Sequence, residues 1–313
     1  MIKMIRKETY SKTIDFRNHK LGLYDVKTFI KDWGSEPRRG IKEKRCRIIK
    51  KKSEKLLEIT IPKGTESDGG SFWRLNFPKS LTDVTFEYDV MFGQDFNFVR
   101  GGKLPGLGGG ESMGSGGTPE QYQNGFSARL MWREIDFEKE CSMKESLGKE
   151  IKILKEMIKS DESYKKRKEM LNQLNSISNE IIKLGWCFRD LVKEPHKAFL
   201  VQYMYYPDKK GRFGENLAYR YGNNRNNKVF VEPNKWYNIK MRIKLSENSK
   251  QEDTILAWVN GKKVLDKKRN LRKEKSYGIN QVMFSLFFGG DDETWHTKKD
   301  EKVYFRKFVI NGD

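Results

Sequence analysis

The chain of 313 residues carries 63 Lys and Arg against 43 Asp and Glu, a formal net charge of +20 at pH 7. Hydrophobic residues make up 36% and aromatic residues 12%, enough for a folded core, so the composition excludes a disordered chain. No apolar run approaches the ~20 residues that cross a bilayer, and no signal-peptide pattern is visible, so we expect a soluble protein.

The basic excess indicates a polyanionic partner, which can be nucleic acid, anionic lipid or acidic polysaccharide. Cys46, Cys141 and Cys187 are odd in number and lack the spacing of a metal site. We therefore expect free thiols in a reducing compartment.

Short apolar segments separated by turns follow in chain order. Residues 1–45 are weakly patterned, with short apolar runs at 21–24 and 28–33, and we expect an edge strand or two there. The segment 84–92 alternates apolar and polar residues over nine positions, which is typical of a half-buried strand. Further strands are expected at 56–61, 237–245, 254–266, 282–288 and 303–310. Asn260-Gly261 between two apolar runs predicts a two-residue hairpin turn.

Many short strands without alternating helices predict a mainly β fold, an antiparallel sandwich or jelly roll. The segment 137–194 differs, because Leu147, Ile151, Leu154 and Ile158 recur at helical spacing and a second such stripe runs over 171–184. We expect a single domain over 1–313 with a helical hairpin, 137–194, inserted in it. The residues 135–194 hold 13 Lys and Arg against 12 Asp and Glu, so the β domain carries the basic charge.

Residues 98–133 carry the strongest functional signal. The run GGKLPGLGGG predicts a glycine-rich loop that holds Lys103, and GFSARLMWR predicts a strand. In that strand Ser127, Arg129 and Arg133 lie on one face, opposite the apolar residues. Two guanidinium groups and a hydroxyl on one face require water or an anion beside them.

The run YMYYP places Tyr203 and Tyr205 two residues apart, so a strand shows both phenols on one side. Cations beside hydroxyls that can move protons predict a site for a substrate with a carboxylate.

The strings GGKLPGL, GFSARLMWR, YMYYP and FFGGDDETW resemble polysaccharide lyase family 14 over roughly 75–135 and 198–310. The resemblance implies a concanavalin-like β-jelly roll and cleavage of glucuronan- or alginate-type polymers, with no cofactor or metal. It implies that Lys103, Ser127, Arg129, Tyr203 and Tyr205 line the active site. The family has viral members, so a virion-associated location is expected beside a cytoplasmic one.

The chemistry of β-elimination fits these residue types. The C5 proton lies next to a carboxylate, and cations must neutralise that carboxylate before the proton can leave. Arg129 suits a bidentate carboxylate clamp, Lys103 a point charge, and the two tyrosines a base and an acid that are left unassigned.

Substrate contacts are expected from four further residues: Arg133, Gln121, Gln123 and Trp295. The two glutamines stand where a viral member of the family has a histidine before the serine, which puts any histidine-dependent step in doubt. The DDE run 291–293 can bind calcium or rim the cleft, and we favour the rim, with Trp295 stacking on a sugar.

The alternative to a lyase is an inactive module that binds acidic cell-wall or surface polysaccharide. A nucleic-acid partner rests on charge alone, because no recognition helix or aromatic RNA-binding motif is present. The glycine run also departs from the phosphate-binding G-x-x-x-x-G-K-[ST] pattern. We expect an acidic polysaccharide as partner, without nucleic acid or membrane, and the hairpin as a lid, an oligomer contact or a solvated accessory.

Overall fold

A computed structural model of the chain describes residues 9–65, 67–111, 123–134, 150–160, 163–185, 197–210, 213–222, 224, 227–248, 251–273, 277–290 and 293–313. The chain is divided into two compact units. One unit comprises Met1–Glu134 and Ala198–Asp313, and the other is Ile135–Lys197. None of the described helices is long and apolar enough to cross a membrane.

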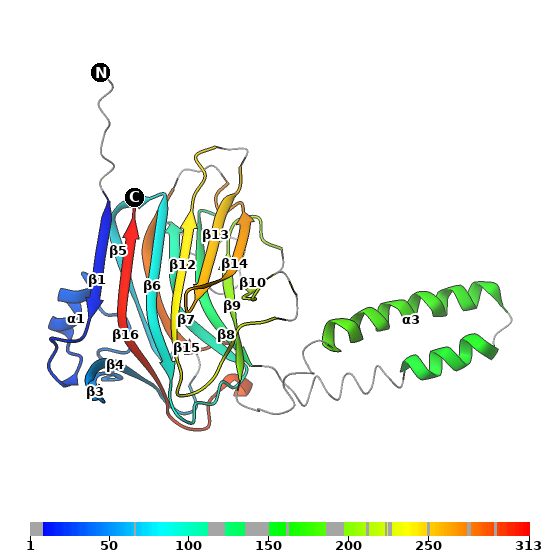
Figure 1. Ribbon diagram of the computed structural model, residues 1–313, viewed down its shortest axis with the longest axis horizontal. Coiled ribbons are helices and arrows are strands. Elements are labelled where there is room, and N and C mark those ends of the chain that lie inside the picture. Colours follow the sequence, from blue (N-terminus) through cyan, green and yellow to red (C-terminus); the bar gives the residue numbers. More distant parts are fainter. Residues whose placement is uncertain are drawn as a thin grey trace, which may run out of the picture. The chain divides into compact units, whose positions relative to one another are not determined.

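The larger unit is a sandwich of two antiparallel sheets, which confirms the mainly β fold (Figure 1). Within the described residues the outer sheet has the order β14-β13-β12-β6-β16-β4-β3-β2, with β1 also paired to β16. Its strands are β1 (Tyr10–Asp15), β2 (Gly22–Leu23), β3 (Cys46–Lys51), β4 (Glu54–Ile61), β6 (Asp83–Phe92), β12 (Trp236–Lys244), β13 (Asp253–Val259), β14 (Lys262–Arg269) and β16 (Glu301–Gly312).

The second sheet carries the residues of interest, and we call it the inner sheet. Its order is β10-β9-β8-β7-β15-β5 in the described part of the chain, and β11 pairs with β9. Its strands are β5 (Ser71–Leu81), β7 (Gly101–Gly110), β8 (Gly125–Glu134), β9 (Ala198–Tyr205), β10 (Glu215–Ala218), β11 (Phe230–Val231) and β15 (Ile279–Phe288).

The predicted hairpin turn is present between β13 and β14. Asn260 and Gly261 have φ angles of 50° and 75°, the positive values that a type I′ turn needs at both central positions. The sequence signal therefore located both the turn and its flanking strands.

The strands β1 and β2 confirm the expectation of an edge strand or two in residues 1–45, since β2 is the last strand of the outer sheet. The run 28–33 forms no strand and is part of the helix α1 (Val26–Trp33), where Asp25 accepts a hydrogen bond from the Thr28 N–H and Gly34 ends the helix at φ 66°. Phe29 and Trp33, four residues apart, are both buried on one helix face.

The glycine-rich run around Lys103 is not a loop but the strand β7. Glycine is a poor strand former in isolation, yet β7 lies between β8 and β15 and pairs with both. Ladder hydrogen bonds on two sides outweigh the weak intrinsic preference of glycine.

The core between the sheets is built largely of aromatic rings. Trp73 of β5 stacks on Phe284 of β15 with ring centroids 3.8 Å apart. Trp33 of α1 packs edge-on against Trp73 and Phe308 at 5.1 Å and 5.2 Å. The helix therefore joins the main core, although it lies outside both sheets.

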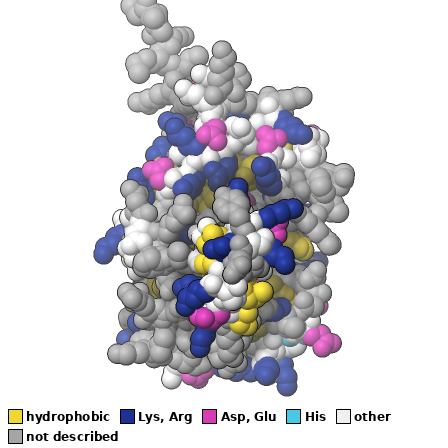
Figure 2. Space-filling model, turned by 90° about the vertical axis from the view of Figure 1, so that its right-hand side faces the viewer, with side chains coloured by type: hydrophobic (Ala, Val, Ile, Leu, Met, Phe, Trp, Pro, Cys, Tyr) yellow, Lys and Arg dark blue, Asp and Glu magenta, His cyan; other side chains and the backbone are white. Residues whose placement is uncertain are grey.

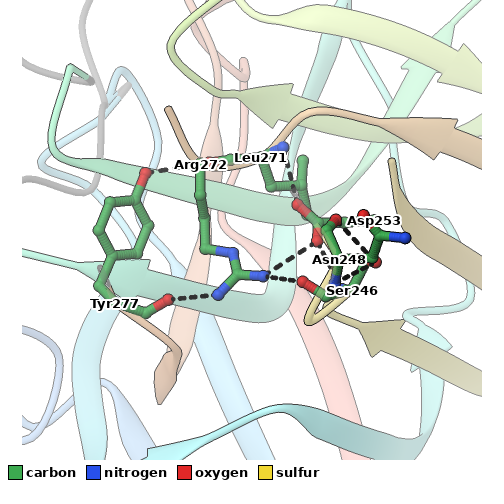
Figure 3. A network of polar contacts seen from close by, with 6 residues as sticks. All are labelled: Ser246, Asn248, Asp253, Leu271, Arg272 and Tyr277. Carbon is green, nitrogen blue, oxygen red and sulfur yellow. Dashed lines mark hydrogen bonds and ion pairs between the residues drawn. The ribbon is translucent and has the colours of Figure 1, made fainter. Parts of the chain in front are cut away.

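A buried polar network links Leu271, Arg272 and Tyr277, which lie between β14 and β15, to residues of the β12–β13 connection and of β13 (Figure 3). Arg272 donates to a carboxylate oxygen of Asp253 at 3.3 Å and to the carbonyl oxygens of Ser246 and Tyr277 at 2.7 Å and 3.0 Å. Asp253 also accepts from the Leu271 N–H at 3.0 Å. Because the ion pair is nearly fully buried and well hydrogen-bonded, it defines one conformation of the segment between β14 and β15.

The described residues of the smaller unit form two helices, over 150–160 and in α3 (Tyr164–Gly185), as the apolar spacing predicts. In the predicted stripes Leu154 and Ile177 are buried and Leu171 is exposed. Ile153 and Met157, which lie outside the stripes, are exposed. The interpretation of 137–194 as an insertion within one domain stays a prediction.

Candidate active site

The strand β8 has one face in the core and one face away from it. Its apolar residues belong to the main core, namely Phe126, Ala128, Leu130 and Trp132. Met131 instead joins a small separate cluster with Val201, Tyr203 and Tyr205, against which Trp295 also packs. The predicted alternation is therefore present, and we call the side opposite the core the open face of the inner sheet.

Strand register brings the five predicted active-site residues together on this face. Tyr205 is the cross-strand partner of Ser127, and Tyr203 is the partner of Arg129. Lys103 of β7 is opposite Met131, and its Nζ lies 3.8 Å from the centroid of the Tyr203 ring. Three adjacent strands thus supply one continuous group of side chains.

Lys103 is held in a desolvated position. Its side chain is 8% exposed, and Nζ donates a hydrogen bond to the Met131 sulfur at 3.0 Å. Burial lowers the pKa of Lys103 well below its ordinary value, and the charges of Arg129 and Arg133 lower that pKa further. An anion that binds here would raise the pKa of Lys103 and so favour the charged ammonium.

Arg129 lies at the centre of the group and is 4% exposed. Its buried Nε has no hydrogen-bond partner among the described residues. Burial lowers the pKa of Arg129, while ionisation of Tyr205 and then of Tyr203 opposes that shift. No described carboxylate forms an ion pair with this arginine, with Lys103 or with Arg133, so the cluster is suited to an anionic ligand.

The two phenols form a hydrogen-bonded pair. Their oxygens are 3.2 Å apart, and the Gly214 N–H donates to the Tyr203 oxygen at 3.0 Å. Burial, followed by the hydrogen bond shared with Tyr205, raises the pKa of Tyr203 to about 12. Tyr203 is therefore protonated at neutral pH and can donate a proton.

Arg133 and Trp295 lie at one end of the group. The guanidinium carbon of Arg133 is 5.7 Å from the Tyr203 ring centroid and 5.5 Å from that of Trp295. Arg100 approaches the same indole ring at 5.8 Å. A Cβ at Gly290 would collide with this indole, so the glycine is required for the position of Trp295.

The remaining predicted residues are not brought into this group by the described contacts. The Gln123 side-chain oxygen accepts a hydrogen bond from Lys273. Gln121, Asp291, Asp292, Cys141 and Cys187 lie outside the described residues. Cys46 is a free, buried thiol. The described residues contain no group of three or more His, Cys, Asp or Glu that could hold a metal ion.

One feature of the site does not follow from the sequence analysis. Gly106 and Gly108 of β7 are register partners of Arg129 and Ser127, and both glycines are buried. A Cβ at Gly106 would collide with the Ala128 carbonyl oxygen, so glycine at this position lets β7 pair closely with β8. The glycine run was the signal, but it was interpreted as a loop.

Comparison with known protein families gives a match over the strands that carry this site. The family model described as Polysaccharide lyase 14 matches residues 49–141 and 199–308, well over half of the chain. No relative was found among curated protein sequences.

Solved structures with the same fold include three alginate lyases. The alginate lyase Aly36B is 20% identical over 96% of both chains, with a TM-score of 0.67. The PL-14 alginate lyase from Aplysia kurodai is 19% identical over 97% of this chain and 98% of its own, with a TM-score of 0.60. The alginate lyase vAL-1 from Chlorella virus is 17% identical over 86% of this chain and 89% of its own, with a TM-score of 0.54.

The sandwich, the buried cation and tyrosine group on its open face and the match over both halves of the β unit agree with one another. The chain is a polysaccharide lyase and belongs to polysaccharide lyase family 14.

Proposed function

We propose that the chain cleaves 4-linked uronate polymers, such as alginate or glucuronan, by β-elimination. The observation that carries this proposal is a group of three cations beside two hydrogen-bonded phenols. Lys103 and Arg129 are buried, Arg133 is partly buried, and none of the three has a carboxylate partner among the described residues. Such a group suits a ligand whose carboxylate is attached to the carbon that loses a proton in the reaction.

Substrate binding begins with the charge of the whole surface. Lys and Arg side chains are spread densely over the face seen in Figure 2, with Asp and Glu scattered among them. A net charge of +20 concentrates polyanions near the protein and speeds their encounter with it. Related structures of Aly36B variants hold an alginate tetrasaccharide and an alginate trisaccharide, which supports an acidic polysaccharide as the ligand here.

Arg129 and Lys103 neutralise the uronate carboxylate in this mechanism. The free Nε of Arg129 supplies a donor for a bidentate contact. The carboxylate raises the pKa of Lys103 from its depressed value and so favours the positive charge beside itself. Both cations stabilise the negative charge that grows on the carboxylate as the C5 proton leaves.

The phenol pair moves the protons. The base, which we assign to Tyr205, takes the C5 proton, and the electrons of that C–H bond form the C4–C5 double bond. The C4–O4 bond breaks, and Tyr203 gives its proton to the departing oxygen. The raised pKa of Tyr203, about 12, keeps its proton in place at neutral pH and suits it to the role of acid, which leaves the role of base to the other phenol.

Ser127, Arg133 and Trp295 complete the site in this proposal. Ser127 is fully buried beside Tyr205 in register and positions the carboxylate or a neighbouring hydroxyl. Arg133 and Trp295 bind an adjacent uronate. Arg133 pairs with the carboxylate of that sugar, and the Trp295 indole stacks on the sugar ring.

The alternative is a binding module that holds the same polymers without cleaving them. It is favoured by the Lys273 hydrogen bond to Gln123, because an occupied neutral amide cannot replace a histidine base. In that case elimination is absent and only affinity remains.

The test is ultraviolet absorbance over time with polyglucuronate, then alginate, from neutral to alkaline pH. Elimination leaves a double bond conjugated to the carboxylate, so a rising signal is expected from the wild type and not from Arg129→Ala. A flat trace on both polymers with binding retained would replace the lyase by the binding module.

A further inference from the structure

A second arginine site lies on the open face of the inner sheet, outside the group described above. Arg74 is on β5, the last strand of this sheet, between Trp73 and Leu75, which point into the core. Alternation therefore places Arg74 on the open face. Its side chain is half-buried, and its Nε is buried without a hydrogen-bond partner among the described residues.

Register places Arg74 in the same row across the sheet as Arg129. The row runs from Arg74 to Met283 of β15, then to Gly106, Arg129 and Tyr203. Three strand spacings of about 4.8 Å separate the two arginines, which gives roughly 14 Å along the sheet. The two positions between them are uncharged, since one is Met283, which is 1% exposed, and the other is the glycine Gly106.

The surroundings of Arg74 combine charge with an aromatic surface. Phe72, two residues earlier on the same face, has its ring centroid 5.9 Å from the guanidinium carbon. Burial, together with the charge of Arg38, lowers the pKa of Arg74. No described carboxylate forms an ion pair with Arg74 or Arg38, so this end of the row also has two cations and no described counter-charge.

We propose that Arg74, with Arg38 and Phe72, forms a distal subsite that binds a second uronate carboxylate of the same polymer chain. This inference rests on the proposed function, and it extends that function to the direction and length of the bound chain. The polymer crosses the strands from β10 toward β5, along the row that joins the two arginines. Full binding then requires an oligosaccharide that reaches from Arg129 to Arg74.

The test compares Arg74→Met with the wild type on defined oligouronates of increasing length, from trisaccharides upward. Methionine keeps an apolar stem against Phe72 and removes only the charge and its donors. We expect KM for long oligosaccharides to rise about tenfold, as for one lost charge-assisted hydrogen-bonded contact, with kcat retained. Trisaccharides that cannot span the row should be unaffected.

Two matched variants define the effect. Arg47→Met removes an exposed arginine from β3 of the outer sheet and should leave every length unchanged. Arg74→Lys retains the charge and should recover part of the lost affinity for long chains. Equal thermal melting of all variants confirms that each is folded.

Failure of this inference is distinguishable from failure of the lyase mechanism. Cleavage with an identical dependence on chain length in the wild type and Arg74→Met refutes the subsite and leaves the lyase intact. If no uronate polymer is cleaved, calorimetric binding of the same oligosaccharides decides. A selective loss of affinity for long chains in Arg74→Met then supports the subsite, and unchanged affinity at every length refutes it.

Discussion

Replacing Arg129 with methionine should change activity and stability in opposite directions. The side chain is 4% exposed, and its positive charge adds to that of Lys103, whose own pKa is lowered by this arginine. The two residues are diagonal neighbours on adjacent strands, roughly 7 Å apart. At an effective dielectric constant of about 20 their repulsion is about 2 kcal/mol. Methionine removes that repulsion and the desolvation of one charge while filling much of the same volume.

For a chain of this size, a gain of about 2 kcal/mol corresponds to a rise of a few °C in the melting temperature. Loss of the central donor to a developing negative charge should lower kcat by about 10²–10³-fold. Calorimetry and the ultraviolet assay measure the two effects on the same protein, with Arg47→Met as the control expected to change neither.

Two results would refute this reasoning about Arg129. A kcat within tenfold of the wild type would show that the guanidinium does not stabilise the reacting carboxylate. A melting temperature several degrees below the wild type would show that the cation is held by favourable contacts instead of being tolerated for function.

Four further predictions concern other parts of the molecule. Because the pKa of Tyr203 is raised to about 12, the folded state keeps a proton that an unfolded tyrosine loses near pH 10. The free energy of unfolding should therefore fall between about pH 10 and 12. The melting temperature of Tyr203→Phe should decrease less with pH in that window than that of the wild type, and an equal decrease in both would contradict the raised pKa. When the lysines carry isotopically labelled methyl groups, the NMR signal of Lys103 should titrate with a midpoint at lower pH than those of the other lysines. Binding of an oligouronate should shift this midpoint to higher pH. A midpoint equal to those of the other lysines would contradict burial of the charge. Gly106→Ala places a Cβ against the Ala128 carbonyl and should destabilise by more than about 2 kcal/mol in urea titrations, unlike Gly93→Ala, whose nearest contact is 3.1 Å; equal effects contradict the close approach of β7 and β8. Replacing 137–194 by a short linker should leave a cooperatively melting β unit, and loss of that transition would contradict its interpretation as an insertion.

Strands with clean alternation could be predicted from the sequence. The period of two in β6 and β12 and the Asn260-Gly261 turn each have a local cause that needs no knowledge of the rest of the fold. The strand β7 could not be predicted this way. Its six glycines favour no conformation, and only ladder partners distant in sequence make it a strand.

The helix α1 shows a related limit. Its eight residues are fewer than an isolated helix needs, and its stability comes from the packing of Phe29 and Trp33 on the core. The Asp25 cap and Gly34 stop were visible in the sequence, but only edge strands were expected in this part of the chain.

The candidate site was largely predictable because spacing of two on one strand fixes a shared face. The register between strands was not, since nothing in the two segments fixes Arg129 opposite Tyr203 and not one residue further along. The distance between Lys103 and the Tyr203 ring likewise depends on where β7 pairs, which the loop interpretation left undefined.

The position of β16 has a consequence for how the protein folds. This strand, residues 301–312, is inserted between β4 and β6, and it also pairs with β1, so that Tyr10 is opposite Gly312. During synthesis, β4 and β6 emerge long before the strand that joins them, and each presents an unpaired edge. The outer sheet can close only after residues 301–312 leave the ribosome, and pairing over nearly 300 residues carries a high loop-closure cost. Folding should therefore be slow and largely post-translational, and chaperones that cover strand edges should raise the yield of native protein.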